Sequence, residues 1–318
     1  MSEENSEQLN AAEALLAGDM TLAKELYGSL LEKNPETKDC LCGFYTASYW
    51  ENRMDILHPQ KEGREAASLI MKEWDQFEAV AEEKKFAGCR SLVSSMRFIL
   101  GVSAANLRFA YQMQGASGDT DLLLELSHCL IRIENFSDAI EILQYARKFN
   151  KENPKILFAL GEAFLSTEDP EMREKGISFY RDAFFIEPSA FEISHVYSLP
   201  VGDVLKELYE NFGEDIKKAC EWLPSYLLSD YFIPELRCMG TGEIEQAVSE
   251  VRRLVKDLGR VADEFKNRVR SRVAFYSIVL IHYFTFCEQD VSLVREYEQI
   301  LAEMDSRLHE RFLRQKRG

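Results

Sequence analysis

The chain of 318 residues contains 46% hydrophobic residues and carries a formal net charge of −16. A chain of this length and composition can bury a continuous core without disulfide bonds, which excludes an intrinsically disordered protein. The negative charge repels nucleic acid phosphates and anionic membranes, and it serves either solubility or the attraction of a basic partner. The most apolar run, 273–287, is shorter than the ~20 residues of a membrane span and predicts a buried helix instead.

The N-terminal part of the chain reads as helices. Apolar residues recur with the 3.6-residue helical period along nearly the whole sequence, which predicts an all-α fold with almost no strand. After a turn at Gly18-Asp19, a first helical pattern runs to Pro35 through three spaced apolar residues: Ala23, Tyr27 and Leu30. Segments 38–51, 62–84 and 90–112 each predict one helix, and the glycine- and serine-containing run 115–119 predicts a flexible connection.

The middle of the chain contains an ordered series of large and small residues. From Pro154 to Pro188 the series is Leu157, Leu160, Gly161, Phe164, Gly176, Tyr180 and Ala183. Thirty-four residues earlier, the first half recurs as Leu123, Leu126, Ser127 and Leu130, and Ala139, Leu143, Ala146 and Pro154 follow it. Small residues at these positions let two antiparallel helices approach closely, so that the large residues interlock.

This series resembles the tetratricopeptide repeat (TPR) family, whose repeat of 34 residues is a helical hairpin. The resemblance covers about residues 7–35 and 120–188. It departs from the family where three residues are inserted around Asp169-Pro170-Glu171, and the region 36–119 fits no repeat cleanly. The resemblance implies a right-handed superhelix, an α-solenoid of antiparallel helix pairs, that binds peptides or partner proteins.

The resemblance also implies where a partner would bind, because the inner groove of the family is lined by defined positions of each first helix. By register these positions are Asp121, Leu124 and His128 in one repeat, and Lys155, Phe158 and Glu162 in the next. The family variant that binds a C-terminal carboxylate has Lys, Arg and Asn at such positions, whereas this chain has Leu124, His128, Phe158 and Glu162, which disfavours binding of that kind. A groove with an aromatic and an acidic residue suits a peptide with apolar and basic side chains, unless the protein's own helices fill it.

The C-terminal part differs in pattern and in charge. Pro200, Pro224 and Pro234 are expected to cut segment 189–242 into short helices. Beyond it, a heptad stripe predicts a helix that packs on its neighbours: Ile244, Val248, Val251, Val255, Leu258, Ala262 and Phe265. Basic residues crowd 252–272, and the candidates for a contact strip are Arg252, Arg253, Arg268 and Arg272. Such a strip either contacts nucleic acid phosphates, pairs with the acidic N-terminal part, or forms a solvated helix face.

Motifs for chemistry are absent from the sequence. His309-Glu310 begins a zinc-protease signature, but position 313 is a leucine where the second histidine belongs. The pair Cys40-x-Cys42 has no second cysteine or histidine pair nearby, and Gly240-Thr241-Gly242 lacks the lysine of a phosphate loop. We therefore expect no catalytic residues, no metal and no cofactor.

Together these patterns predict four regions. They are an N-terminal helical region with one TPR-like hairpin (1–118), two TPR-like repeats (119–188), an irregular helical connector (189–242), and a C-terminal helical bundle or set of capping helices (243–318). The scattered cysteines and the acidic, polar first twenty residues indicate a cytoplasmic protein. The predicted function is that of a non-catalytic adaptor or scaffold that binds a protein or peptide. The alternative is a nucleic-acid-associated regulator that uses the basic C-terminal helices.

Overall fold

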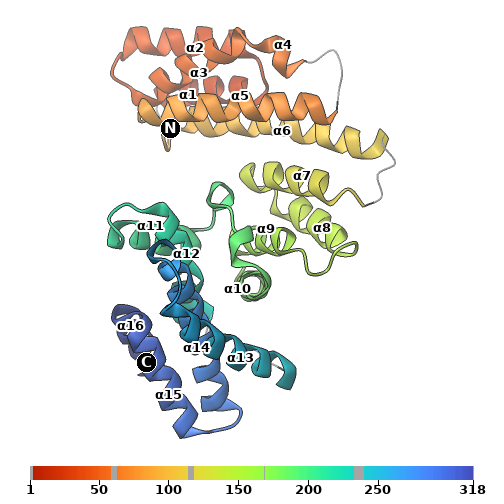
Figure 1. Ribbon diagram of the computed structural model, residues 1–318. Helices are drawn as coiled ribbons and strands as arrows, with labels where there is room; N and C mark the ends of the chain where they lie inside the picture. Colours follow the sequence, from red (N-terminus) through yellow and green to blue (C-terminus); the bar gives the residue numbers. More distant parts are fainter. Residues whose placement is uncertain (1–2, 59–62, 114–117, 168, 233–239, 318) are drawn as a thin grey trace. The chain divides into compact units, whose positions relative to one another are not determined.

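The regular structure of the protein is helical throughout the residues that the structure describes. The computed structural model describes residues 3–58, 63–113, 118–167, 169–232 and 240–317, and no strand occurs in them (Figure 1). The all-α prediction is therefore confirmed. The chain forms two compact units, Met1–Phe149 (unit 1) and Asn150–Gly318 (unit 2). In the described ranges, no helix has both the length and the apolar character needed to cross a lipid bilayer.

Unit 1 consists of helices that pack on their neighbours in sequence. They are α1 (Glu3–Leu16), α2 (Met20–Lys33), α3 (Lys38–Glu51), α4 (Met54–Leu57), α5 (Arg64–Glu83), α6 (Arg90–Met113), α7 (Thr120–Arg132) and α8 (Phe136–Arg147). Helix α6 is the centre of this unit, since it packs on α1, α3, α5 and α7. The predicted helices 38–51, 62–84 and 90–112 correspond to α3, α5 and α6, whereas the short α4 was not predicted.

Unit 2 begins with the hairpin of α9 (Pro154–Leu165) and α10 (Pro170–Ile186). It continues through two short 3₁₀ turns, η1 (Pro188–Ala190) and η2 (Ile193–His195), then α11 (Leu199–Asn211), α12 (Ile216–Leu227) and a π-helical turn, η3 (Leu228–Phe232). The last helices are α13 (Thr241–Leu258), α14 (Asp263–Phe286), α15 (Val291–Met304) and α16 (Ser306–Arg317). Helix α14 packs on α12, α13 and α15. It contains the predicted buried helix 273–287 almost entirely.

Short polar side chains fix where several helices begin. The Asp119 carboxylate accepts a hydrogen bond from the Leu122 backbone N–H at 3.0 Å, and Asn153 Oδ1 accepts one from the Lys155 N–H at 3.0 Å. Each cap satisfies an N–H group that has no partner inside its own helix. Pro154 occupies the first position of α9, where its missing N–H costs nothing. The start of α9 is therefore encoded locally.

Glycines allow tyrosine rings to pack against helix backbones in both units. A Cβ atom added at Gly161 of α9 would lie 2.4 Å from Tyr180 Cδ2 of α10. In unit 1, a Cβ atom at Gly43 of α3 would lie 2.4 Å from the Tyr27 ring of α2. Both tyrosine side chains are completely buried. The predicted close packing of small against large residues is present in α9 and α10, and unit 1 repeats it between α2 and α3.

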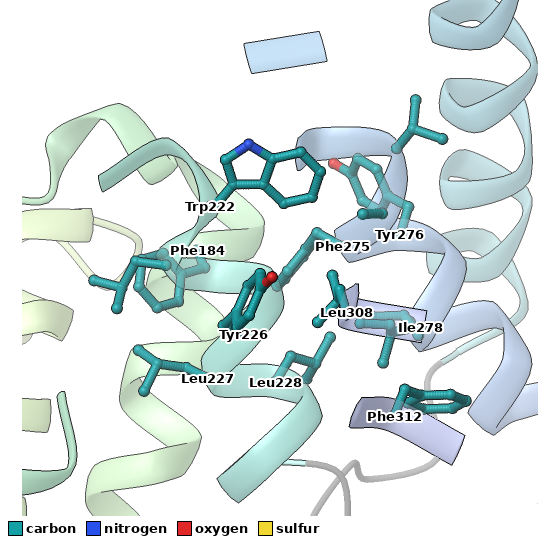
Figure 2. Close-up of a cluster of buried hydrophobic side chains, with 14 of the residues drawn as sticks. Phe184, Trp222, Tyr226, Leu227, Leu228, Phe275, Tyr276, Ile278, Leu308 and Phe312 are labelled. Atoms are coloured by element: carbon teal, nitrogen blue, oxygen red, sulfur yellow. The ribbon is translucent and has the colours of Figure 1, made fainter. Parts of the chain in front are cut away.

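Side chains from distant parts of the sequence form the core of unit 2. Figure 2 shows Phe184 of α10, Tyr226 of α12, Phe275 of α14 and Phe312 of α16 in one buried cluster. Apolar contact of this kind joins the α9/α10 hairpin to the C-terminal helices. The predicted connector and bundle therefore share one core with the preceding hairpin.

Two details of the prediction for unit 2 differ from the structure. Pro224 lies inside α12 and does not end it, although the π-helical turn begins four residues later. Proline has no N–H to donate to the preceding turn, and the helix type changes at Leu228. On α13 the buried stripe is Ile244, Ala247, Val251 and Leu254, which has heptad spacing in another phase than predicted, so that Val255 is exposed. Helix α13 ends at Leu258, and the predicted stripe residues Ala262 and Phe265 lie beyond it. Pro234 lies outside the described residues.

The predicted region boundary after residue 118 stays a prediction, and the two compact units divide at another point of the chain. The division falls between Phe149 and Asn150, so that α7 and α8 belong to unit 1 while α9 and α10 belong to unit 2. The physical reason is that α7 packs on α6 as well as on α8. The packing of unit 1 therefore continues from α6 to α7. Residues 115–117 of the predicted connection lie outside the described residues.

Candidate functional site

One face of α9 carries three of the predicted groove residues. Lys155, Phe158 and Glu162 are spaced by three and four positions, which places them on one side of a helix. The structure assembles them along that side, and it also shows what lies against each of them. Segment 191–198, which connects α10 to α11 through η2, contacts all three.

Phe158 lies in a group of aromatic rings. Its ring centroid is 5.0 Å from that of Phe184 and 5.5 Å from that of Tyr180, both in α10. Phe191 stands at the start of segment 191–198. Its ring centroid lies 5.5 Å from that of Phe158 and 6.1 Å from that of Phe184. All the pairs that Phe158 makes are T-shaped, which is a favoured arrangement for aromatic rings. Phe158 is consequently only 7% exposed.

Glu162 is a buried carboxylate with four hydrogen-bond donors. Oε2 accepts from the backbone N–H of Tyr197 at 2.9 Å and of Ser198 at 2.8 Å, and Oε1 accepts from Ser198 Oγ at 2.9 Å. The hydroxyl of Tyr180 also donates to Oε1. The side chain is 2% exposed, and this burial raises its pKa above the ordinary value even though the donors favour the charged form.

Lys155, Phe158 and Glu162 form a stripe along one side of α9, and Lys155 lies at the N-terminal end of this stripe. Its Nζ lies 2.7 Å from Glu192 Oε1, and His195 Nδ1 lies 3.5 Å from the other oxygen of Glu192. The hydrogen bond from Lys155 and its positive charge lower the pKa of Glu192. Because more than half of the Lys155 side chain is exposed, this ion pair adds little stability, but it fixes which residue of the segment lies beside Lys155.

The predicted groove on α9 is therefore filled by the chain itself. The sequence left open whether Phe158 and Glu162 line an open groove or one filled by the protein's own helices, and in the structure Phe191 and the backbone of Tyr197 and Ser198 cover them. The reason is chemical. Exposing an aromatic ring to water costs free energy, and so does burying a carboxylate without hydrogen-bond donors. In the structure, Lys155 alone of the three keeps an exposed side chain.

The earlier triplet lies on α7 in unit 1. Asp121 is exposed, Leu124 is 6% exposed and His128 is half-buried. Leu124 therefore belongs to the core and is not available to a partner, contrary to its predicted role in the groove. Asp121 remains at the surface. Since the two triplets belong to different units, each face is a separate candidate.

The predicted basic strip is partly neutralised by the protein. Arg253 pairs with Glu250 at 2.7 Å and with Asp257 at 3.4 Å along α13. Arg272 is half-buried, donates to the backbone carbonyls of Phe184 and Phe185 at 3.2 and 3.5 Å, and lies over the ring of Tyr276. Arg272 thus binds the C-terminal end of α10, where a cation is favoured by the helix dipole.

Arg252 and Arg268, like Arg253, have side chains that lie at the surface. They are on different helices, α13 and α14. Helix α13 packs its buried stripe against the core. Its opposite side carries acidic residues as well as arginines, since Glu245 is exposed and Asp257 is half-buried. The intramolecular pairs of Arg253 match the alternative that the sequence left open, a solvated helix face with local ion pairs.

The cysteine side chains of unit 1 are buried. Within the residues that the structure describes, no cluster of three His, Cys, Asp or Glu side chains could hold a metal ion. Cys42 lies beside Thr46 in the core of unit 1, and burial raises its pKa to about 12. At neutral pH this thiol is protonated, and a protonated thiol is neither a nucleophile nor a metal ligand.

Comparisons of the chain with protein-family models, with curated proteins and with solved structures find no match. The resemblance to the TPR family therefore depends on the residues quoted above and on the packing that they produce.

Sequence reasoning found the α9 side of this site and missed the other side. Phe191, Tyr197 and Ser198 carry no motif, and two of the contacts to Glu162 come from backbone N–H groups, which any residue except proline provides. One signal was present: Glu162 is the only charged residue in 156–165, a stretch that is otherwise apolar or small. A carboxylate in such a stretch needs a buried partner.

The buried carboxylate predicts a specific pH dependence. The pKa of Glu162 is raised in the folded protein above its unfolded value, so its contribution to stability is present at low pH and is lost as pH rises through the folded pKa. Glu162→Gln removes this titration, and its amide still offers an oxygen to the two N–H groups and donors to the two hydroxyls. We expect the stability of Glu162→Gln relative to wild type to increase with pH from about 4.5 upward.

Urea unfolding of both proteins between pH 4 and pH 8 measures this difference. Glu162→Ala is the control, because it leaves the N–H groups of Tyr197 and Ser198 without an acceptor and should be less stable at every pH. A difference between Glu162→Gln and wild type that stays constant or falls with rising pH would contradict the prediction.

Proposed function

We propose that the protein is a non-catalytic adaptor or scaffold of the TPR type, which binds a partner protein or peptide through the surfaces of its helical hairpins. The observation that carries the proposal is the contact of Gly161 with Tyr180, in which the smallest and the largest residues of the repeat pattern meet across one hairpin. The same contact between Gly43 and Tyr27 supports a solenoid-like stacking of neighbouring helices. Such hairpins present helix faces and require no reactive group.

The chemistry of the surface supports a partner with basic and apolar side chains. The chain carries a net charge of −16, with 41 acidic against 24 basic residues before residue 241. Asp121 on α7 is an exposed acidic member of the predicted groove. A cytoplasmic location fits the buried thiols of Cys42, Cys89 and Cys129, which form no disulfide.

The proposal is tested by affinity capture. Tagged full-length protein should retain a specific protein from native lysate, and the captured protein, purified separately, should bind in a fluorescence anisotropy titration. Asp121→Lys should weaken this binding at least tenfold, because it reverses a charge at the candidate surface. Glu141→Lys, an exposed glutamate on the adjacent α8, is the matched control.

Binding that changes equally in Asp121→Lys and Glu141→Lys would remove Asp121 from the contact surface. Capture of no protein beyond the background of the tag alone would count against the adaptor function itself.

A further inference from the structure

We propose that segment 191–198 acts as an intramolecular ligand of the α9 face, and that the partner of this face is an extended peptide in which an acidic residue follows an aromatic one. The partner binds by displacing the segment. This inference rests on the proposed function as a peptide-binding adaptor. It assigns the chemistry of the peptide from the contacts that the segment makes.

The segment approaches α9 mostly as an extended chain. Phe191 has φ −66° and ψ 129°, Glu192 has φ −119° and ψ 114°, and Val196 has φ −93° and ψ 115°. The short turn η2 lies between them. An extended backbone directs N–H groups outward, where another chain can accept them. In this protein, those of Tyr197 and Ser198 point to the carboxylate of Glu162.

Each of the three residues on the stripe recognises a different feature of the segment. Phe158 contacts an aromatic ring, Lys155 binds the acidic side chain next to that ring, and Glu162 accepts backbone N–H groups further along. An aromatic residue followed by an acidic one, in a chain with free N–H groups, is therefore the pattern that the face selects. The buried Glu162 adds specificity, because any replacement must again supply donors to its oxygens.

The segment is held more weakly than the helices that flank it. Ser198 alone among its residues is buried, and the Ile193 side chain is 43% exposed. Its internal backbone hydrogen bonds are limited to short turns such as the 3.1 Å bond from the Val196 N–H to the Ile193 carbonyl. Phe191 and Val196 pack against the core of unit 2, but both are only partly buried. Few fully buried apolar contacts are a feature of regions that open locally, below the free energy of global unfolding.

The flanking helices have contacts of their own that do not depend on the segment. Arg272 donates to the carbonyls of Phe184 and Phe185 at the end of α10, and α11 packs on α12. Segment 191–198 can therefore leave the face of α9 while α10 and α11 stay folded. Because the segment is tethered, its effective concentration at the face is in the millimolar range, and a separate peptide competes poorly unless the segment is weakened.

The test uses a fluorescein-labelled synthetic peptide with the sequence of residues 188–199 and the full-length protein. Phe191→Ala with Glu192→Ala weakens the segment but leaves α9 unchanged. This double variant should bind the peptide at least tenfold more tightly than wild type in an anisotropy titration. Adding Lys155→Glu should abolish the gain, and a peptide with alanine at the positions of Phe191 and Glu192 should not bind.

The matched control is Ile193→Ala with Ser194→Ala, since both side chains are exposed residues of the same segment. It should bind the peptide no more tightly than wild type. The inference is overturned if the Phe191→Ala, Glu192→Ala variant retains its helical circular dichroism and cooperative unfolding, yet binds the peptide no better than wild type.

Hydrogen exchange of the wild-type protein tests the inference without any substitution. The amides of Tyr197 and Ser198 should exchange through local opening, at least tenfold faster than the central amides of α9. Exchange of these two amides only together with α9, by global unfolding, would overturn the inference. If the double variant binds the peptide but the protein captures no cellular partner, the adaptor function alone is contradicted. If the protein captures a partner through Asp121 but the double variant does not bind the peptide, this inference alone is contradicted.

Discussion

Replacing Arg311 by Met is expected to destabilise unit 2 by about 3–5 kcal/mol, the usual loss when one partner of a buried ion pair is removed. Arg311 extends from α16 to Asp230 in the π-helical turn η3, where Nε lies 2.5 Å from Oδ1 and Nη2 donates to Oδ2. Its Nη1 lies 2.6 Å from Glu207 of α11, and its guanidinium lies over the ring of Tyr226. One side chain thus joins α16 to three other elements: η3, α11 and α12.

The expected loss of stability is large because Arg311→Met leaves the buried Asp230 carboxylate without its partner. The Asp230 side chain is 7% exposed, and burial raises its pKa while Arg311 opposes that shift. Without Arg311, the carboxylate stays in the core either as an uncompensated charge or with a proton taken up at a free-energy cost. Methionine retains the apolar stem of arginine, so the change tests the charge and its hydrogen bonds more than the packing.

Urea unfolding followed by circular dichroism measures the loss, and two variants control it. Arg253→Met removes an exposed pair with Glu250 on α13 and should change stability by less than about 1 kcal/mol. Adding Asp230→Asn to Arg311→Met should recover a large part of the loss, because the unpaired charge is then gone. Equal effects of Arg311→Met and Arg253→Met would show that the buried pair contributes no more than a surface pair.

Replacing Gly161 by Ala is the second substitution for which we expect a large loss, about 1–3 kcal/mol, as for other insertions into a well-packed core. The added Cβ would lie 2.4 Å from Tyr180 Cδ2 and 2.9 Å from Cε2. The ring cannot move away freely, since it is completely buried and its hydroxyl donates to Glu162. The displacement would therefore also disturb the carboxylate that binds segment 191–198.

Gly202 provides a matched control in the same unit. It lies inside α11, and a Cβ atom built there would meet no atom within 4 Å. Alanine at such an open helical position should stabilise the protein by about 0.5–1 kcal/mol, because glycine loses more conformational entropy on folding. The two glycine-to-alanine changes are thus expected to have opposite signs. A stabilising Gly161→Ala would contradict the interlocked packing of α9 and α10.

Much of the helical architecture follows from local sequence. The caps Asp119 and Asn153, the proline at the start of α9 and the apolar period set the helices within a few residues of their observed bounds. The close approach of α9 and α10 was also predictable, because a glycine opposite a tyrosine at repeat spacing has few other uses. These features depend on residues that are near one another in the chain, and short-range geometry decides them.

The candidate site was predicted only on one side. Lys155, Phe158 and Glu162 were found because helical spacing alone places them on one face. Segment 191–198, which lies against them, has neither a helical period nor a motif, and two of its contacts use the backbone. The same limitation applied to Arg272, which the sequence places in a basic strip and the structure places at the end of α10.

By itself, the sequence determined which segments are helices, where several of them begin, and which residues of α9 share a face, since these properties depend on neighbours within one or two turns. Only the tertiary structure decided that the chain divides after Phe149, that Arg311 reaches Asp230, and that the stripe on α9 is covered by the protein's own residues. These contacts join residues far apart in the chain. Their formation depends on how whole helices pack, and no local pattern records that packing.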